Sequence, residues 1–178
     1  MAKFEPNMVN LFLPYSRHKL VSQYMPRLRK CVEPLTEEQI WWRPNASSNS
    51  IGNLILHLNG NVQQWLVDSF NHREDTRDRP AEFAAKGNIP KAKLLETLEW
   101  TVHEAASALD RMGEEVLITR HEIQGYSVYG LEAVYQVVEH FALHYGQIVY
   151  ITKMLCDQDL GFYKELNQTG RAQGPAHP

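Results

Sequence analysis

The chain has 178 residues, a formal net charge of −3 at pH 7 and an isoelectric point near 6.2. This slightly acidic balance gives no electrostatic support for nucleic-acid binding. No run reaches the ~18 apolar residues of a membrane span, and the N-terminus lacks the apolar core of a signal peptide, so we expect a cytoplasmic protein that does not enter a membrane. The length predicts a single domain over residues 1–167, followed by a disordered tail at 168–178.

The first predicted helix covers about residues 11–32, and Pro26 inside it should kink or split it. Thr36 then opens a short helical turn through a capping pattern, and the turn ends at the pair Trp41-Trp42. We expect these two tryptophans to pack at one end of the fold rather than to bind a ligand.

A second helix follows Ser50, with an apolar face formed by Ile51, Leu54, Ile55, Leu58, Val62 and Trp65. His57 borders this face. The same histidine also belongs to a mostly polar row along the helix, which is typical of a solvated side. Helical periodicity therefore leaves the role of His57 undecided.

Residues 71–88 are polar and charged, and they predict a long loop that crosses over the helices. Arg77 and Arg79 alternate there with acidic residues. This pattern is typical of a locally paired surface loop, and the alternative is a clamp for a substrate anion. A third helix begins after Pro90 and stops at Gly113.

Residues 116–130 are rich in β-branched and aromatic side chains and have no helical period. We expect an irregular connection there, with at most one short extended piece. Tyr126 comes shortly before the next helix, where it could either pack against the fold or hang over a binding site.

The fourth predicted helix covers about residues 131–155 and carries His140 and His144 one turn apart. Two imidazoles at this spacing can share one metal ion. Two core histidines satisfied by hydrogen bonds are an equally good interpretation of the pair alone. A third ligand would decide between the two, and His57 is the best candidate.

Several motifs follow one another along the chain: Asn49-Ser50-Ile51, His57 with Gly60-Asn61, Arg77-Asp78-Arg79 with Glu82-Phe83, and His140-x-x-x-His144-x-Gly146-Gln147-Ile148. In this order they resemble the DinB/YfiT-like family of metal-dependent enzymes and, within it, the DUF1572 branch. The resemblance implies an all-α, up-down-up-down four-helix bundle with a divalent metal, zinc or nickel, on His57, His140 and His144. One departure is the segment 62–65, which lacks the basic residue expected of close relatives, so no substrate contact is carried over.

Three neutral imidazoles leave a dication its full charge and an open position, where it can acidify a bound water or thiol. Asn61 and Gln147 are placed to orient the histidine rings or to meet a substrate. Glu139 is a poor general base, because on an ideal helix it points about 100° away from His140.

The resemblance implies an enzyme that acts on a small molecule, either a thiol S-transferase or a hydrolase. A thiol S-transferase would use a low-molecular-weight thiol as a second cofactor, and Arg77 and Arg79 could bind the anionic groups of that thiol. The alternative is a non-catalytic metal-binding or interaction protein with the same three histidines. The resemblance also implies a homodimer.

Overall fold

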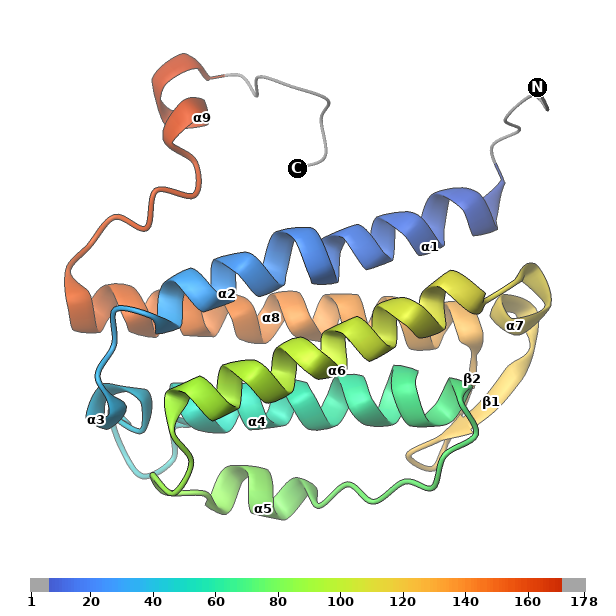
Figure 1. The fold of residues 1–178 in the computed structure, drawn as a ribbon, viewed down its shortest axis with the longest axis horizontal. Coiled ribbons are helices and arrows are strands. Elements are labelled where there is room, and N and C mark those ends of the chain that lie inside the picture. The colour runs from blue at the N-terminus through green and yellow to red at the C-terminus, as the bar shows by residue number, and fades with distance from the viewer. Residues whose placement is uncertain (1–6, 171–178) are drawn as a thin grey trace.

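The structure is a computed structural model that describes residues 7–170. It is mostly helical, with one small two-stranded sheet. Long helical segments lie side by side along the molecule (Figure 1). They are α1 (Met8–His18) with η1 (Lys19–Tyr24) and α2 (Met25–Val32), then α4 (Ile51–Val62) with η2 (Gln63–Asp68), then α6 (Lys91–Arg111), and last α8 (Gly130–Cys156).

The first long segment is interrupted where a proline was expected to disturb it. The π-helical stretch η1 ends at Tyr24, and Pro26 then lies in the first turn of α2. A proline is tolerated at that position because the first turn of a helix does not use its backbone N–H.

Shorter elements connect the long helices: α3 (Glu37–Ile40), α5 (Arg79–Ala84), α7 (Glu114–Ile118), β1 (Arg120–Ile123), β2 (Tyr126–Tyr129) and α9 (Lys164–Thr169). The strands β1 and β2 form an antiparallel hairpin, so the all-α prediction is wrong in this connection. Gln124 and Gly125 form its two-residue loop with φ angles of 55° and 80°, as a type I′ hairpin turn requires. The predicted tail overlaps α9 at its start, and residues 171–178 lie outside the described residues.

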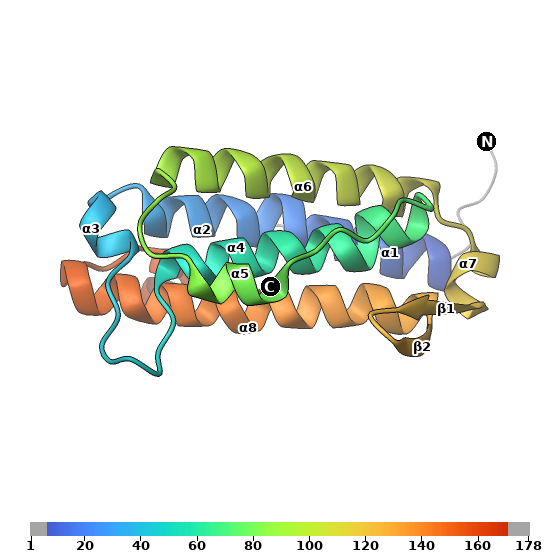
Figure 2. The same ribbon diagram turned by 90° about the horizontal axis from the view of Figure 1, so that it is seen from below.

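The order of helix directions also differs from the prediction. Helices α4 and α6 point the same way, and α8 runs parallel to α1 and α2 (Figure 1), so the up-down-up-down order is wrong. The reason is the connection between Asp68 and Lys91, which returns along α4 before α6 begins and carries α5 across its surface (Figure 2). Short loops join antiparallel neighbours, whereas a connection of this length allows a parallel pair.

The core is built from the apolar faces that the helical periods predict. On α8 the members Val134, Val137, Phe141 and Ile148 are fully buried. The end of α4 is closed by Trp41, whose ring packs over Gly52 and whose Nε1 donates to the backbone oxygen of Ile89 (3.3 Å). Trp41 therefore packs as expected. Within the described range, no helix combines the length and apolar character that crossing a membrane requires.

Candidate metal centre

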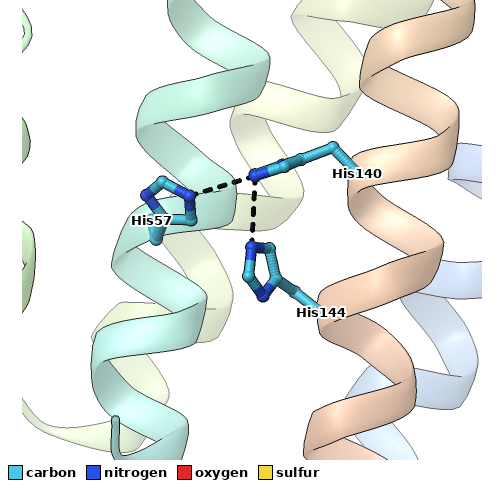
Figure 3. A group of neighbouring side chains, drawn as sticks. All are labelled: His57, His140 and His144. Atoms are coloured by element: carbon cyan, nitrogen blue, oxygen red, sulfur yellow. Dashed lines mark hydrogen bonds between the residues drawn. The ribbon is translucent and has the colours of Figure 1, made fainter. Parts of the chain in front are cut away.

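Three histidines from two helices converge on one point (Figure 3). His57 comes from the middle of α4, and His140 and His144 come from successive turns of α8. The Nε2 atom of His140 lies 3.0 Å from Nε2 of His57 and 3.1 Å from Nε2 of His144. One nitrogen from each of the three rings lies within 4.8 Å of the others. Ligands on one tetrahedral zinc ion, with bonds of about 2.1 Å, are separated by about 3.4 Å, so the spacing fits a single ion.

The outer nitrogens of two rings determine what the inner nitrogens can do. Nδ1 of His57 lies 2.7 Å from a carboxylate oxygen of Glu82, and Nδ1 of His144 lies 2.7 Å from the amide oxygen of Gln147. Arg77 Nη2 also lies 3.1 Å from Nδ1 of His57, but the Glu82 carboxylate is nearer. The carboxylate and the Gln147 oxygen are both acceptors, so each Nδ1 carries the proton and donates it. In the neutral rings, the Nε2 atoms of His57 and His144 then both present lone pairs toward His140. One cation at this point would satisfy all three nitrogens.

Glu82 is the residue that holds His57, and it reaches the ring from α5. Its side chain and that of Arg77 are only 9% and 6% exposed, and Arg77 Nε donates to Glu82 Oε1 over 2.7 Å. Burial raises the pKa of Glu82, but the hydrogen bonds from His57 and Arg77 outweigh burial and hold that pKa below its ordinary value. Glu82 is therefore a carboxylate that fixes the orientation of the His57 ring.

Gly60 allows this carboxylate to come close to α4. A Cβ at position 60 would lie 2.0 Å from Oε1 of Glu82 and 2.8 Å from Nε of Arg77. Glycine inside a helix costs about 1 kcal/mol relative to alanine. Glycine at position 60 therefore leaves space for the Glu82 carboxylate, which a side chain there would displace from His57.

The crossing segment is tied to α4 by further polar contacts. Asn53 completes the N-terminal capping box of α4 with Ser50, and its amide nitrogen donates to the backbone oxygens of Glu82 (2.8 Å) and Ala85 (3.0 Å). At the other end, Arg77 Nη1 donates to the amide oxygen of Gln64 over 2.9 Å. These contacts hold α5 over the middle of α4, where Glu82 meets His57.

The two arginines of the predicted anion clamp have different surroundings. Arg77 is buried and paired with Glu82, which does not match a clamp open to substrate. Arg79 is exposed, and its guanidinium lies 5.0 Å from the centre of the Phe83 ring, which in turn lies 4.8 Å from the centre of the His57 ring. Arg79 therefore lies at the rim of the histidine cluster.

The two histidines of α8 have fewer hydrogen bonds to surrounding side chains than His57 has. Burial, followed by electrostatic interaction with the rings of His144 and His57, lowers the pKa of His140 to about 3. Burial also lowers the pKa of His144, although its hydrogen bond to Gln147 acts in the opposite direction. Both rings are therefore neutral near pH 7, the form that binds metal. The Nδ1 atom of His140 is buried and has no hydrogen-bond partner among the described residues.

The other residues predicted for the site divide between the cluster and its surroundings. Gln147 orients His144, as its position one turn later predicted. Asn61 does not hold His57, because its amide oxygen is buried with no hydrogen-bond partner among residues 7–170 and Glu82 takes that role. Tyr126 is 62% exposed on the hairpin, 6.4 Å from the Trp65 ring centre, and does not belong to the cluster. From the sequence, Glu82 was part of the motif Arg77-Asp78-Arg79 with Glu82-Phe83, but we predicted no role for it.

The fold and the cluster together define a mostly helical protein with a three-histidine arrangement of the kind that holds a metal ion. The chain belongs to the DUF1572 family, described as proteins of unknown function, whose profile matches residues 7–165. A search of curated proteins found no match. Among solved structures, a conserved protein of Enterococcus faecalis is similar, with a TM-score of 0.69 and 19% identity, over 80% of this chain and 96% of that one. At this identity the likeness shows the fold alone.

Proposed function

We propose that the protein is a metal-dependent enzyme of the DinB/YfiT-like kind, a four-helix bundle that holds one divalent ion on His57, His140 and His144. The observation that carries the proposal is the direction of the lone pairs. His57 and His144 each donate their outer proton to a fixed acceptor, so their inner nitrogens meet at His140 without a proton on either. In a metal-free network the single Nε2–H of His140 would have to be shared between these two lone pairs, whereas one cation would satisfy all three nitrogens.

When bound, the ion supplies a Lewis acid that can lower the pKa of a thiol or a water beside it. Three neutral ligands preserve its charge, and zinc or nickel suits an all-imidazole site. Glu82 and Gln147 keep the rings of His57 and His144 in position, so that the ligand set does not have to rearrange.

The positions of the nearby carboxylates favour a thiol over a water as the group that the metal activates. Glu82 lies behind His57 and is occupied by that ring and by Arg77. Glu139 is exposed, and no carboxylate joins the histidine cluster among the described residues. Water activation generally uses a base within reach, whereas a thiol on a Lewis acid is acidified directly. We therefore place the thiol S-transferase reaction ahead of the hydrolase, with a low-molecular-weight thiol as second cofactor.

A non-catalytic metal protein is the second candidate, and one feature argues against it. A groove of small-molecule size is lined in part by Gln147, the hydrogen-bond partner of His144. A purely structural metal would not need such access, because structural zinc sites are closed by four protein ligands. The homodimer and the cytoplasmic location stay predictions, and no contact described above depends on them.

The metal is tested by elemental analysis of the purified protein beside the His57→Ala and His144→Ala variants. We expect about one ion per chain in the parent and loss in both variants. Circular dichroism controls for folding. If either variant keeps its metal, the ligand set is wrong; if the parent takes up no zinc, nickel or cobalt on reconstitution, the metal proposal is wrong.

The thiol is tested on the cobalt(II)-substituted protein. Adding a low-molecular-weight thiol should produce a sulfur-to-cobalt charge-transfer absorption, because a thiolate that enters the open position bonds to the ion directly. The His144→Ala variant, incubated with the same cobalt, is the control. A protein that holds cobalt but gives no such band at any thiol concentration would favour the hydrolase reading.

A further inference from the structure

A groove runs along α8 between Leu143 and Met154. The connection before α4 forms one wall, α8 forms the other, and Leu54 of α4 contributes to the lining. Its volume is about 700 Å³, within the range of small-molecule sites. Residues of two helices and of the connection between α3 and α4 therefore form the groove together.

The groove adjoins the cluster through one side chain. Gln147 lines the groove, and its amide oxygen is the acceptor for His144. Leu54, which also lines the groove, lies one helical turn before His57 and therefore projects from the same side of α4. A molecule that fills the groove would contact Gln147, the residue that orients His144.

None of the side chains that line the groove is charged. Trp42, Ile151 and Met154 supply apolar and aromatic surface, and Ser48, Asn49 and Gln147 supply uncharged hydrogen-bonding groups. A charged ligand would lose its hydration here without gaining a counter-charge, which is unfavourable. An apolar or aromatic body would gain from burial and could pack against the indole of Trp42.

We infer that this groove binds the uncharged, largely apolar body of the substrate, whose reacting end lies at the histidine cluster. The inference rests on the proposed function and narrows its substrate class to neutral apolar or aryl compounds. It also gives Trp42 a different role from that of Trp41: Trp41 closes the end of the core, and Trp42 faces the ligand. From the sequence we expected both tryptophans to pack at one end of the fold.

The test uses phenylnaphthylamine, a neutral fluorophore that brightens in apolar surroundings, and anilinonaphthalene sulfonate, its anionic counterpart. We expect saturable binding of the neutral probe and much weaker binding of the anionic one. Gly146→Leu is the blocking variant, because a Cβ at position 146 meets no atom within 4 Å and the side chain would enter the groove. This variant should weaken neutral-probe binding by about tenfold or more, since it fills the apolar space.

A matched pair of tyrosines on α8 provides the control. Tyr150 lines the groove and is 68% exposed, whereas Tyr135 is 57% exposed on the same helix and does not line it. Tyr150→Ala should weaken neutral-probe binding several-fold, and Tyr135→Ala should leave it unchanged. Equal effects of the two substitutions, or full binding by Gly146→Leu, would overturn the inference.

Two further measurements separate this inference from the proposed function. In the metal-loaded parent, cobalt in place of zinc should broaden the NMR lines of the bound probe. Lack of broadening in a protein that holds cobalt would mean that the groove ligand is remote from the cluster, which contradicts the inference. If the parent holds no metal but Gly146→Leu still blocks the probe, the groove site stands and the metal function fails.

A second copy of the chain is the other possible occupant, because Leu143 and Met154 beside the groove are 59% and 55% exposed. Light scattering decides this point. A parent dimer that becomes a monomer in Gly146→Leu, with no probe bound to either form, would make the groove an interface between copies and overturn the inference.

Discussion

The two walls of the histidine cluster are built differently. On α4, His57 is 5% exposed and is held by Glu82, which is itself held by Arg77 and by close contact with Gly60. On α8, His140 and His144 are only partly buried. Outside the three rings, their orienting contact among residues 7–170 is the hydrogen bond from His144 to the exposed Gln147. One wall depends on a buried charge network and the other on the period of a single helix.

This difference teaches where the cluster is sensitive to change. Breaking a buried ion pair leaves an uncompensated charge, at a cost of about 3–5 kcal/mol. Removing an exposed hydrogen-bonding side chain usually changes stability by less than about 0.5 kcal/mol. Perturbing the α4 wall should therefore affect both folding and metal binding, whereas perturbing Gln147 should affect metal binding alone.

The largest effect is expected from His140→Ala, which removes the central ligand. Loss of a residue that orients a ligand lowers metal affinity by about 10–100-fold. Loss of His140, a ligand itself, should lower it by more than this. Isothermal titration with zinc measures this loss. Glu139→Ala, next in the chain and exposed, is the control and should bind zinc as the parent does. Equal affinity in His140→Ala and the parent would contradict the three-histidine site.

Glu82→Ala should come next, because it breaks the α4 wall and leaves Arg77 buried without its partner. We expect a loss of about 3–5 kcal/mol in the free energy of unfolding and about 10–100-fold in zinc affinity. Urea unfolding and zinc titration measure the two quantities. Glu96→Ala is a control, since its partner Lys93 is exposed and the pair should contribute little. A Glu82→Ala protein of parental stability would mean that the carboxylate does not hold this wall together.

In the Gly60→Ala variant, the gain in helix propensity is opposed by a steric clash with Glu82. Alanine favours a helix by about 1 kcal/mol over glycine, but its Cβ would overlap Oε1 of Glu82. We expect no gain in stability and a loss of zinc affinity of about tenfold, as Glu82 shifts from His57. Gly146→Ala on the α8 wall is the matched control, because its Cβ meets nothing within 4 Å. It should gain stability and keep its zinc affinity; the same outcome for Gly60→Ala would refute the role given to Gly60.

The smallest effect is expected from Gln147→Ala. Stability should stay within about 0.5 kcal/mol of the parent, because the side chain is exposed. Zinc affinity should fall by about tenfold, the lower end for an orienting partner, because the His144 ring becomes free to rotate. Measuring Glu82→Ala and Gln147→Ala side by side tests the comparison of the walls directly. If Gln147→Ala is as destabilising as Glu82→Ala, the two walls do not differ as described.

Features that join residues close together in the chain follow from the amino-acid sequence alone. The apolar stripe of α8 follows from its helical period, and so does the placement of His140 and His144 on one side of it. Gln147 one turn after His144 is a local relation of the same kind. These were predictable because a helix has a fixed geometry whatever surrounds it.

Contacts between distant segments, in contrast, depend on how the whole chain folds. His57 lies 83 positions from His140 and 25 from Glu82, so their contacts depend on the path of the crossing segment and on the parallel direction of α4 and α6. The same path buried Arg77, which the sequence left as a choice between a surface pair and an anion clamp. Helical periodicity carries no information about that path, because many topologies bury the same apolar faces equally well.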